Sequence, residues 1–442
     1  MRVSDELRSW AELGHRRWHM PGHKGRPAIA GSYLPWAYDT TELRRSDDLH
    51  HPTGVLAEML ERGHALFGGE GIYALTGGST EGILMAIYAT VERGADVLVA
   101  RQSHRAVWHG LELVSAKIHT IPSRYHRQVP LPPSLAEIQE AYRPEIRYAI
   151  LTSPTYEGLQ ACDLAASIEF LHERDVLVIV DAAHGAQFGH GPWPVSAIQA
   201  AADISVMSLH KTLPAPTSTA ILVYQGERLD RDALARAFDL FATSSPSYWL
   251  LAGIDECFEF LVEADFEAYY QRCQQLRVAL AEHGPLYEAP VEYCQDVSKF
   301  LLRCDDAQGL DESLYQLGFE SEYARSGMVL LMEGPLSDEV DLSKLPTWED
   351  ATEGDRFEFG TSEDWPPFVI QIPRRCVYVP SQEAINEVAA RELWLYPPGI
   401  PLVLPGERYR ASVIEKLNGA RDLRGDYLLE ADDLYVPIVR QS

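Results

Sequence analysis

Two residues that follow apolar runs, Lys211 and Asp181, have side chains suited to cofactor chemistry. Lys211 lies in the segment Ser208–Thr212 (SLHKT), and Asp181 directly follows Val176–Val180 (VLVIV). A lysine amine can bind the aldehyde of a pyridoxal cofactor covalently. A carboxylate can keep the ring nitrogen of that cofactor protonated, so that the ring withdraws electrons from a substrate α-carbon. Taken alone, such a lysine is most often a surface residue and such an aspartate is often a helix N-cap.

A glycine-rich segment could bind the phosphate of the same cofactor. Thr76–Thr80 (TGGST) precedes a helix-like segment, Gly82–Thr90, and offers hydroxyls and backbone N–H groups at a helix start. Neither a GxxxxGK[ST] nor a GxGxxG motif is present, which argues against the common nucleotide sites. His104 could stack its imidazole on the cofactor ring, although a hydrogen-bonded structural histidine is the simpler alternative.

The elements that must position these residues are short apolar runs alternating with amphipathic segments. The predicted strands are Val97–Ala100, Arg147–Leu151, Val176–Val180, Ile204–Ser208 and Ala220–Tyr224. The predicted helices between them include Leu135–Tyr142 and Leu164–Glu173, the latter capped by Asp163. Strands that are apolar throughout indicate a mostly parallel sheet covered on both faces, and ligands bind beyond the carboxyl ends of such strands.

Downstream of this sheet we expect a smaller domain. A polar helix over Ala264–His283 leads to a strand at Ser298–Arg303, and the acidic, turn-rich segment Leu336–Trp365 indicates a surface loop. The expected division is an N-terminal segment, 1–55, that contributes to the active site or a dimer, a large cofactor-binding domain, 56–290, and a small C-terminal domain, 291–442.

Composition limits the classes of partner. The 442 residues include 46% hydrophobic residues and carry a formal net charge of -27, so nucleic acid and anionic membranes are improbable partners. The six cysteines form no CxxC pair, which favours a reducing compartment and argues against a zinc site. The sequence has no signal-peptide pattern and no apolar run near the roughly 20 residues that span a bilayer, so we expect a cytoplasmic protein. From the residue types we expect no metal site.

Ordered motifs make the chain resemble a known family, the Orn/Lys/Arg decarboxylases. The motifs are HMPGHKG (His19–Gly25), DDLHHPTG (Asp47–Gly54), GGSTEG (Gly77–Gly82), SHRAVWHGLEL (Ser103–Leu113), TSPTYEG (Thr152–Gly158), VDAAHGAQFG (Val180–Gly189), SLHKTLPAPTSTA (Ser208–Ala220), TSSPSYWLLAGID (Thr243–Asp255) and YPPGIPLVLPGE (Tyr396–Glu407). The resemblance covers nearly the whole chain and is to the short form of the family. It implies an α/β protein with the fold type I architecture of the pyridoxal-phosphate-dependent transferases, plus a smaller α+β C-terminal domain.

The resemblance also assigns roles to individual residues. The implied catalytic residues are Lys211, His210, Asp181 and His104. The implied contacts to pyridoxal 5′-phosphate are Gly78, Ser79, Thr80, His104, Asp181, His184, Ser208, Lys211, Thr243 and Ser244, of which Thr243 and Ser244 would reach the phosphate of a neighbouring subunit. Glu407 would bind the distal cation of the substrate. The aspartate motif usually reads DEAHGAH, and the departures here, Ala182 and Gln187, put substrate choice and proton handling in doubt.

The implied reaction is α-decarboxylation of a basic amino acid by a homodimer or higher homo-oligomer. Arginine, lysine or ornithine would yield agmatine, cadaverine or putrescine, and arginine is slightly favoured. Two alternatives stay open, since one fold supports many pyridoxal reactions. The chain could be an aminotransferase or an aldolase, or it could be a noncatalytic relative that regulates a decarboxylase. Loss of Lys211 or Asp181 would mark a noncatalytic relative, and both are present.

Overall fold

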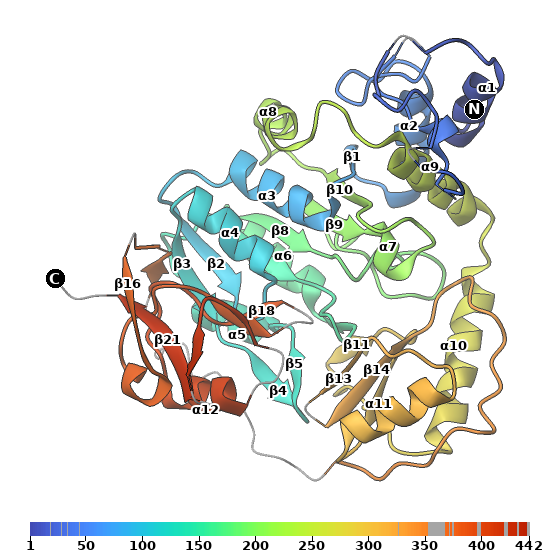
Figure 1. Ribbon diagram of the computed structural model, residues 1–442. Coiled ribbons are helices and arrows are strands. Elements are labelled where there is room, and N and C mark those ends of the chain that lie inside the picture. Colours follow the sequence, from blue (N-terminus) through green and yellow to red (C-terminus); the bar gives the residue numbers. More distant parts are fainter. Residues whose placement is uncertain are drawn as a thin grey trace.

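The computed structural model describes residues 1–442 (Figure 1) except 18, 28, 33, 44, 326, 352–366, 371, 374, 396–398, 420–422, 431, 432 and 440–442. An eight-stranded sheet occupies its centre, in the order β1-β10-β9-β8-β6-β2-β3-β15. The strands, in chain order, are β1 (Gly71–Leu75), β2 (Asp96–Ala100), β3 (Lys117–Ile121), β6 (Tyr148–Thr152), β8 (Leu177–Asp181), β9 (Ile204–Ser208), β10 (Ala220–Tyr224) and β15 (Phe368–Val369). Five neighbouring strands, from β9 to β3, are parallel, whereas β1, β10 and β15 add antiparallel pairs at the two edges.

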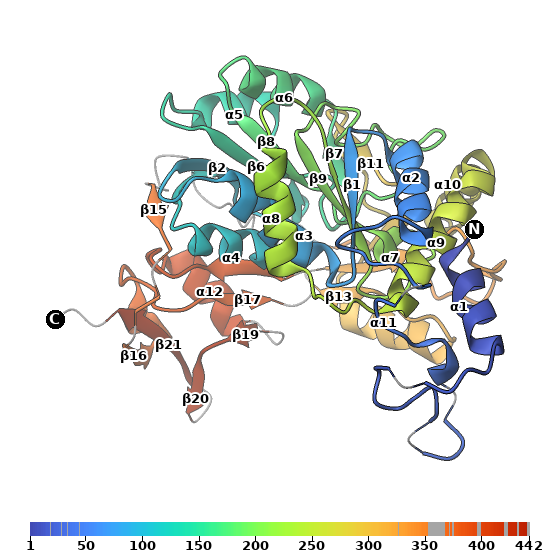
Figure 2. The same ribbon diagram turned by 90° about the horizontal axis from the view of Figure 1, so that it is seen from above.

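Helices cover both faces of the sheet, as Figure 2 shows: α5 and α6 lie on one side, and α3, α4 and α8 on the other. The helices are α1 (Val3–Glu12), α2 (Val55–Phe67), α3 (Gly78–Thr90), α4 (Arg105–Leu113), α5 (Leu135–Ala141), α6 (Leu164–His172), α7 (Leu209–Thr212), α8 (Arg231–Phe241), α9 (Tyr248–Glu263), α10 (Phe266–Ala281), α11 (Ala307–Gln316) and α12 (Ala411–Gly419), with 3-10 turns η1 (Trp36–Tyr38) and η3 (Ser381–Ala384). Among the described helices, none combines the length and the apolar character needed to cross a membrane.

Smaller sheets flank the central one. They are built from β4 (Arg124–His126), β5 (Val129–Leu131), β7 (Leu159–Ala161), β11 (Tyr293–Gln295), β12 (Lys299–Arg303), β13 (Tyr323–Arg325), β14 (Met328–Met332), β16 (Cys376–Pro380), β17 (Leu393–Leu395), β18 (Ile400–Val403), β19 (Leu423–Gly425), β20 (Leu428–Glu430) and β21 (Asp433–Val439). The sheet β12-β14-β13 packs beside β11, and the strands from β16 onward, with α12, surround a separate apolar cluster that includes Tyr409 and Val436.

The predicted α/β architecture is confirmed. The apolar strands of the sheet are buried because helices cover both of its faces. Every residue of β8 and β9 is buried, as expected for parallel strands that have helices on both faces. The predicted strands at Ile204–Ser208 and Ala220–Tyr224 agree with β9 and β10 in full, and the other three differ by one residue at one end or both.

The structure shifts several predicted helix ends by one or two residues, the polar helix being Phe266–Ala281 rather than Ala264–His283, and it moves one helix start by four residues. Helix α3 begins at Gly78 rather than at the predicted Gly82, so Ser79 and Thr80 belong to its first turn. Gly78 has φ +76°, a left-handed conformation that glycine adopts without steric cost, which lets the chain enter the helix directly from the turn. Of the predicted loop Leu336–Trp365, residues 336–351 contain no helix or strand, and 352–365 lie outside the described residues.

Candidate active site

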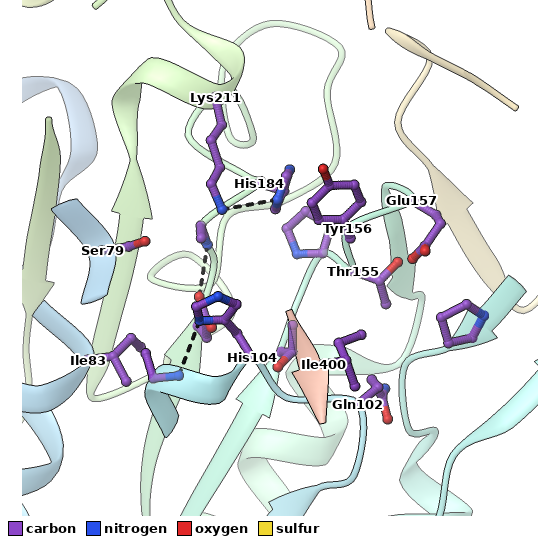
Figure 3. A pocket seen from close by; sticks show the side chains of 16 residues that line it. Ser79, Ile83, Gln102, His104, Thr155, Tyr156, Glu157, His184, Lys211 and Ile400 are labelled. Carbon is purple, nitrogen blue, oxygen red and sulfur yellow. Dashed lines mark hydrogen bonds between the residues drawn. The ribbon is translucent and has the colours of Figure 1, made fainter. Parts of the chain in front are cut away.

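A cavity opens at the carboxyl ends of the parallel strands (Figure 3). It collects side chains from the loops after β2, β6 and β8, from the first turns of α3 and α7, and from β18. The lining residues are Ser79, Ile83, Gln102, His104, Ala106, Pro130, Thr152, Pro154, Thr155, Tyr156, Glu157, Asp181, Ala183, His184, Lys211 and Ile400. Five of the predicted site residues therefore lie on one cavity: Ser79, His104, Asp181, His184 and Lys211.

Lys211 extends into this cavity from the short helix α7, which directly follows β9. Its Nζ lies 3.1 Å from Nε2 of His184. Burial lowers the pKa of Lys211 below its ordinary value, because the charged form loses its hydration, while Asp181 acts in the opposite direction. A lysine with a lowered pKa is more often neutral, and a neutral amine can attack a carbonyl group.

Asp181 is the last residue of β8 and is 4% exposed. Its Oδ1 accepts the backbone N–H of Ala183 at 3.2 Å. Burial raises the pKa of the Asp181 carboxyl, and the nearby Lys211 lowers it. A buried carboxylate needs a cationic or hydrogen-bonding partner, so this position suits a protonated ring nitrogen.

His184 lies between two lysines. Its Nε2 is close to Lys211, as described, and its Nδ1 is 3.0 Å from Nζ of Lys299 in β12. The ring of Tyr156 packs against the imidazole with a centroid distance of 4.5 Å. Burial and the two flanking lysines hold the pKa of His184 well below its usual value, so the imidazole is neutral at physiological pH.

Two hydroxyls meet beside the cavity, Ser79 from the first turn of α3 and Ser208 from the end of β9. Ser208 Oγ donates a hydrogen bond to Ser79 Oγ at 2.9 Å. The N–H of Gly77 already donates to Oε2 of Glu81 at 2.6 Å. The two serines and the other N–H groups of the first turn are therefore the groups that could bind a phosphate. Thr80, also predicted to bind phosphate, is exposed at this turn.

His104 caps α4, and its Nδ1 accepts the backbone N–H of Ala106 at 3.2 Å. Burial, together with the charge of Lys211, lowers the pKa of His104 to about 4. A neutral, fixed imidazole on the cavity wall is suited to stack on an aromatic ring. These groups together could hold a pyridoxal cofactor.

Seven predicted site residues are not part of the cavity lining. Gly78, Thr80 and Ser208 lie next to Ser79 at the start of α3 or at the end of β9, whereas His210, Thr243, Ser244 and Glu407 have other surroundings. His210 turns away, with Nδ1 3.0 Å from the carbonyl oxygen of Thr219. Thr243 and Ser244 are exposed between α8 and α9, where the Thr243 carbonyl oxygen lies 3.1 Å from Nε2 of His50. Glu407 is 7% exposed and also lies outside the lining.

Glu407 forms a buried ion pair with Arg101 instead. Arg101 is fully buried, and its Nη2 donates to Oε2 of Glu407 at 3.1 Å. The same guanidinium donates to the carbonyl oxygens of Pro401 at 2.8 Å and Leu402 at 3.2 Å, and the Leu404 N–H donates to Oε2 of Glu407 at 2.8 Å. The carboxylate that was assigned to the substrate's distal cation thus already has a cationic partner within the chain.

We therefore expect Glu407→Ala to destabilise the fold. Removal of one partner of a buried ion pair leaves an uncompensated charge, which costs about 3–5 kcal/mol. Urea unfolding should show this loss, and the matched double variant Arg101→Met/Glu407→Met should recover part of it. Normal stability combined with a raised KM for substrate would instead support a direct role of Glu407 in substrate binding.

The sequence interpretation overlooked two cavity residues, Tyr156 and Glu157, and the buried Lys299 behind the cavity wall. Tyr156 and Glu157 lie in the predicted motif Thr152–Gly158 but were given no role, and Lys299 was only part of a predicted strand. One oxygen of Glu157, Oε2, is buried without a hydrogen-bond partner in the described part of the chain. The charged residues at the two ends of the otherwise apolar strand KFLLR, Lys299 and Arg303, were a signal that this strand buries cations.

Comparisons with known proteins agree with this geometry. Residues 3–278 match the major domain of the Orn/Lys/Arg decarboxylases, and residues 370–424 match their C-terminal domain. The chain is 32% identical to the uncharacterized protein YaaO of Bacillus subtilis (strain 168), over 92% of each chain. It is 26% identical to the arginine decarboxylase of Halalkalibacterium halodurans, over 88% of this chain and 87% of that protein. The structure of lysine decarboxylase A from Pseudomonas aeruginosa superposes with a TM-score of 0.78 at 17% identity, over 99% of this chain and 80% of that protein.

Proposed function

Because the chain belongs to the Orn/Lys/Arg decarboxylase family, we propose that it is a pyridoxal-phosphate-dependent decarboxylase of a basic amino acid, with arginine slightly favoured. The products would be the corresponding amine and carbon dioxide. The observation that carries the proposal is the placement of Lys211 and Asp181 on one buried cavity at the carboxyl ends of neighbouring strands. The preference for arginine is supported by relatives named arginine decarboxylase.

The groups around the cavity fit this cofactor. The buried carboxylate of Asp181 suits a protonated ring nitrogen, and the neutral imidazole of His104 suits the face of a ring. Ser79 and Ser208 present hydroxyls at a helix N-terminus, which favours a phosphate. The Lys211 amine reaches the same space. When bound, pyridoxal phosphate supplies an aldehyde for covalent attachment and a ring that accepts electrons.

The residues of the chain would then control proton positions and water. Lys211 can hold a proton at Nζ and donate it to the substrate α-carbon after carbon dioxide has left. Asp181 would keep its negative charge opposite a cation, since a buried carboxylate without one becomes neutral. Tyr156 and Ile400 line the cavity and would help to keep water from the reacting atoms, which would strengthen the charge interactions inside.

A substrate screen tests the proposed function. The purified protein, supplied with pyridoxal phosphate, should absorb as a coloured complex and release carbon dioxide and an amine from arginine more readily than from lysine or ornithine. Appearance of a keto acid without carbon dioxide would favour the aminotransferase alternative, and cleavage of a carbon–carbon bond to an aldehyde would favour the aldolase. A protein that binds the cofactor but turns over none of these substrates would favour the regulatory alternative.

We further propose that the enzyme is a homodimer whose active sites are shared. The hydroxyls of Thr243 and Ser244 are exposed and lie outside the cavity of their own chain, so a partner's phosphate is the target that the family resemblance suggests. A symmetric dimer would give two such sites.

Complementation between two inactive variants tests this shared site. Lys211→Ala cannot attach the cofactor, and Thr243→Asp should repel the phosphate that it faces. With random pairing, half of the dimers are mixed and each has one intact site, so co-refolding should restore about a quarter of wild-type activity. If subunit exchange is demonstrated and no activity returns, each site is built from one chain.

A further inference from the structure

Lys299 is a buried cation directly behind the candidate active site. It is the first residue of β12, and its side chain is 0% exposed. Its Nζ donates to the carbonyl oxygen of Tyr156 at 2.6 Å and lies 3.0 Å from Nδ1 of His184. A lysine without solvent needs acceptors and negative charge nearby, and here both acceptors belong to residues that line the cavity.

Two buried carboxylates favour the charged form of Lys299. Asp296 and Glu157 both raise its pKa, whereas burial lowers it to about 8, so the ammonium form predominates at neutral pH. Asp296 is fully buried and is fixed by Ser298 and by Nε2 of Gln187, which donates to its Oδ2 at 2.8 Å. Gln187 is one of the two departures from the family motif, and this contact gives it a place in the support of the site.

His184 therefore joins two amines, one at each ring nitrogen. A neutral imidazole carries one N–H, so one ring nitrogen donates a hydrogen bond and the other accepts one. If Lys299 donates to Nδ1, then Nε2 carries the hydrogen and donates toward Nζ of Lys211. In the opposite arrangement Lys211 donates to Nε2, and Lys299 must be neutral, because only a neutral amine can accept the hydrogen bond from Nδ1.

The surroundings favour the first arrangement. Lys299 has two buried carboxylates beside it, whereas Lys211 has Asp181, and Glu322 contributes to both lysines. The other titratable groups that act on His184 are His104 and His210, and the pKa of each is lowered by burial, so neither adds a positive charge at neutral pH. The ring of Tyr156 packs against the imidazole of His184, and the Tyr156 hydroxyl donates a hydrogen bond to Glu322.

We infer that Lys299 is a positioning residue: by donating to Nδ1 it holds His184 in the Nε2–H tautomer, so that His184 presents a hydrogen-bond donor to Lys211 and to the group that Lys211 binds. An N–H group at Nε2 of His184 favours the neutral form of Lys211, because only a neutral amine can accept its hydrogen bond. The same N–H group would remain available to an oxygen of a bound cofactor. The benefit to catalysis rests on the proposed function, but the tautomer itself does not.

The tautomer can be measured on the ligand-free protein. In a sample with ¹⁵N-labelled histidine, proton–nitrogen correlation spectra distinguish the protonated from the unprotonated ring nitrogen, and the signals lost in His184→Gln identify His184. We expect one tautomer with the hydrogen on Nε2 at neutral pH. A hydrogen on Nδ1, or on both nitrogens, would overturn the inference whether or not the protein is a decarboxylase.

A variant series then tests whether Lys299 is the cause. In Lys299→Met, which removes the donor, the single Nε2–H form should give way to a mixture or to the Nδ1–H form, while Lys299→Arg should retain the wild-type tautomer. Lys416→Met removes another lysine whose pKa burial lowers, in α12, and serves as the matched control. An unchanged tautomer in folded Lys299→Met would overturn the inference, and the wild-type spectrum remains decisive if that variant does not fold.

Discussion

Replacement of Lys211 by alanine should lower kcat by at least about four orders of magnitude, the largest effect that we expect of any single substitution. Without this amine, the proposed cofactor could not attach to the chain, and the substrate α-carbon would lose its proposed proton donor. The structure offers no second amine on the cavity lining, because Lys299 lies behind His184 and does not reach the cavity in the described part of the chain. Single-turnover assays of carbon dioxide release would measure the loss.

Lys211→Arg is the matched variant, since it keeps a long basic side chain at this position but cannot attach the cofactor. It should be as inactive as Lys211→Ala and should retain the thermal stability of the wild-type protein more closely. In the wild-type protein, borohydride reduction followed by peptide mapping should place the pyridoxyl group on Lys211. A label on another lysine would mean that the attachment site has been assigned wrongly.

Asp181→Ala should reduce kcat by about 10³-fold, which corresponds to about 4 kcal/mol in the activation barrier. The ring nitrogen would no longer be held in its protonated form, so the ring would accept electrons poorly. Cofactor binding should persist in part, because the hydroxyls of Ser79 and Ser208 would still be available to its phosphate. Equilibrium titration with pyridoxal phosphate and steady-state kinetics would separate the two effects.

Asp181→Asn provides the control for shape, because the amide fills the same space without the charge. If the charge matters, Asp181→Asn should be as slow as Asp181→Ala while binding the cofactor more tightly. A rate close to that of the wild-type protein in both variants would show that another group supports the ring nitrogen.

The strands that position the site could be predicted from sequence, because each is apolar over its whole length. Polar residues mark the carboxyl ends of both strands: Asp181 is the last residue of β8, and His210 follows the end of β9. These ends were therefore recognisable in the sequence. The start of α3 was harder to predict, since two glycines and hydroxyl residues are typical of turns as well as of a first helical turn. Tertiary packing decides between these possibilities.

The contacts within the site could be predicted only in part. Sequence motifs brought Ser79, His104, Asp181, His184 and Lys211 to attention, and the structure places all five on one cavity. Lys299 follows His184 by 115 residues and Glu407 follows Arg101 by 306, and such pairings depend on how the small sheets pack against the large one. Linear spacing holds no information on this packing, so the pairing of Glu407 with Arg101 could not be anticipated.

The wall that β18 contributes to the cavity also sets an order of events during synthesis. Arg101 leaves the ribosome 300 residues ahead of Pro401, and Ile400 completes the cavity lining from the same strand. At about 5–20 residues per second, the nascent chain would wait about 15–60 seconds before Arg101 could meet its partners. Loading of the proposed cofactor into the finished cavity would therefore be a late event, which follows translation of the C-terminal residues rather than accompanying the folding of the large sheet.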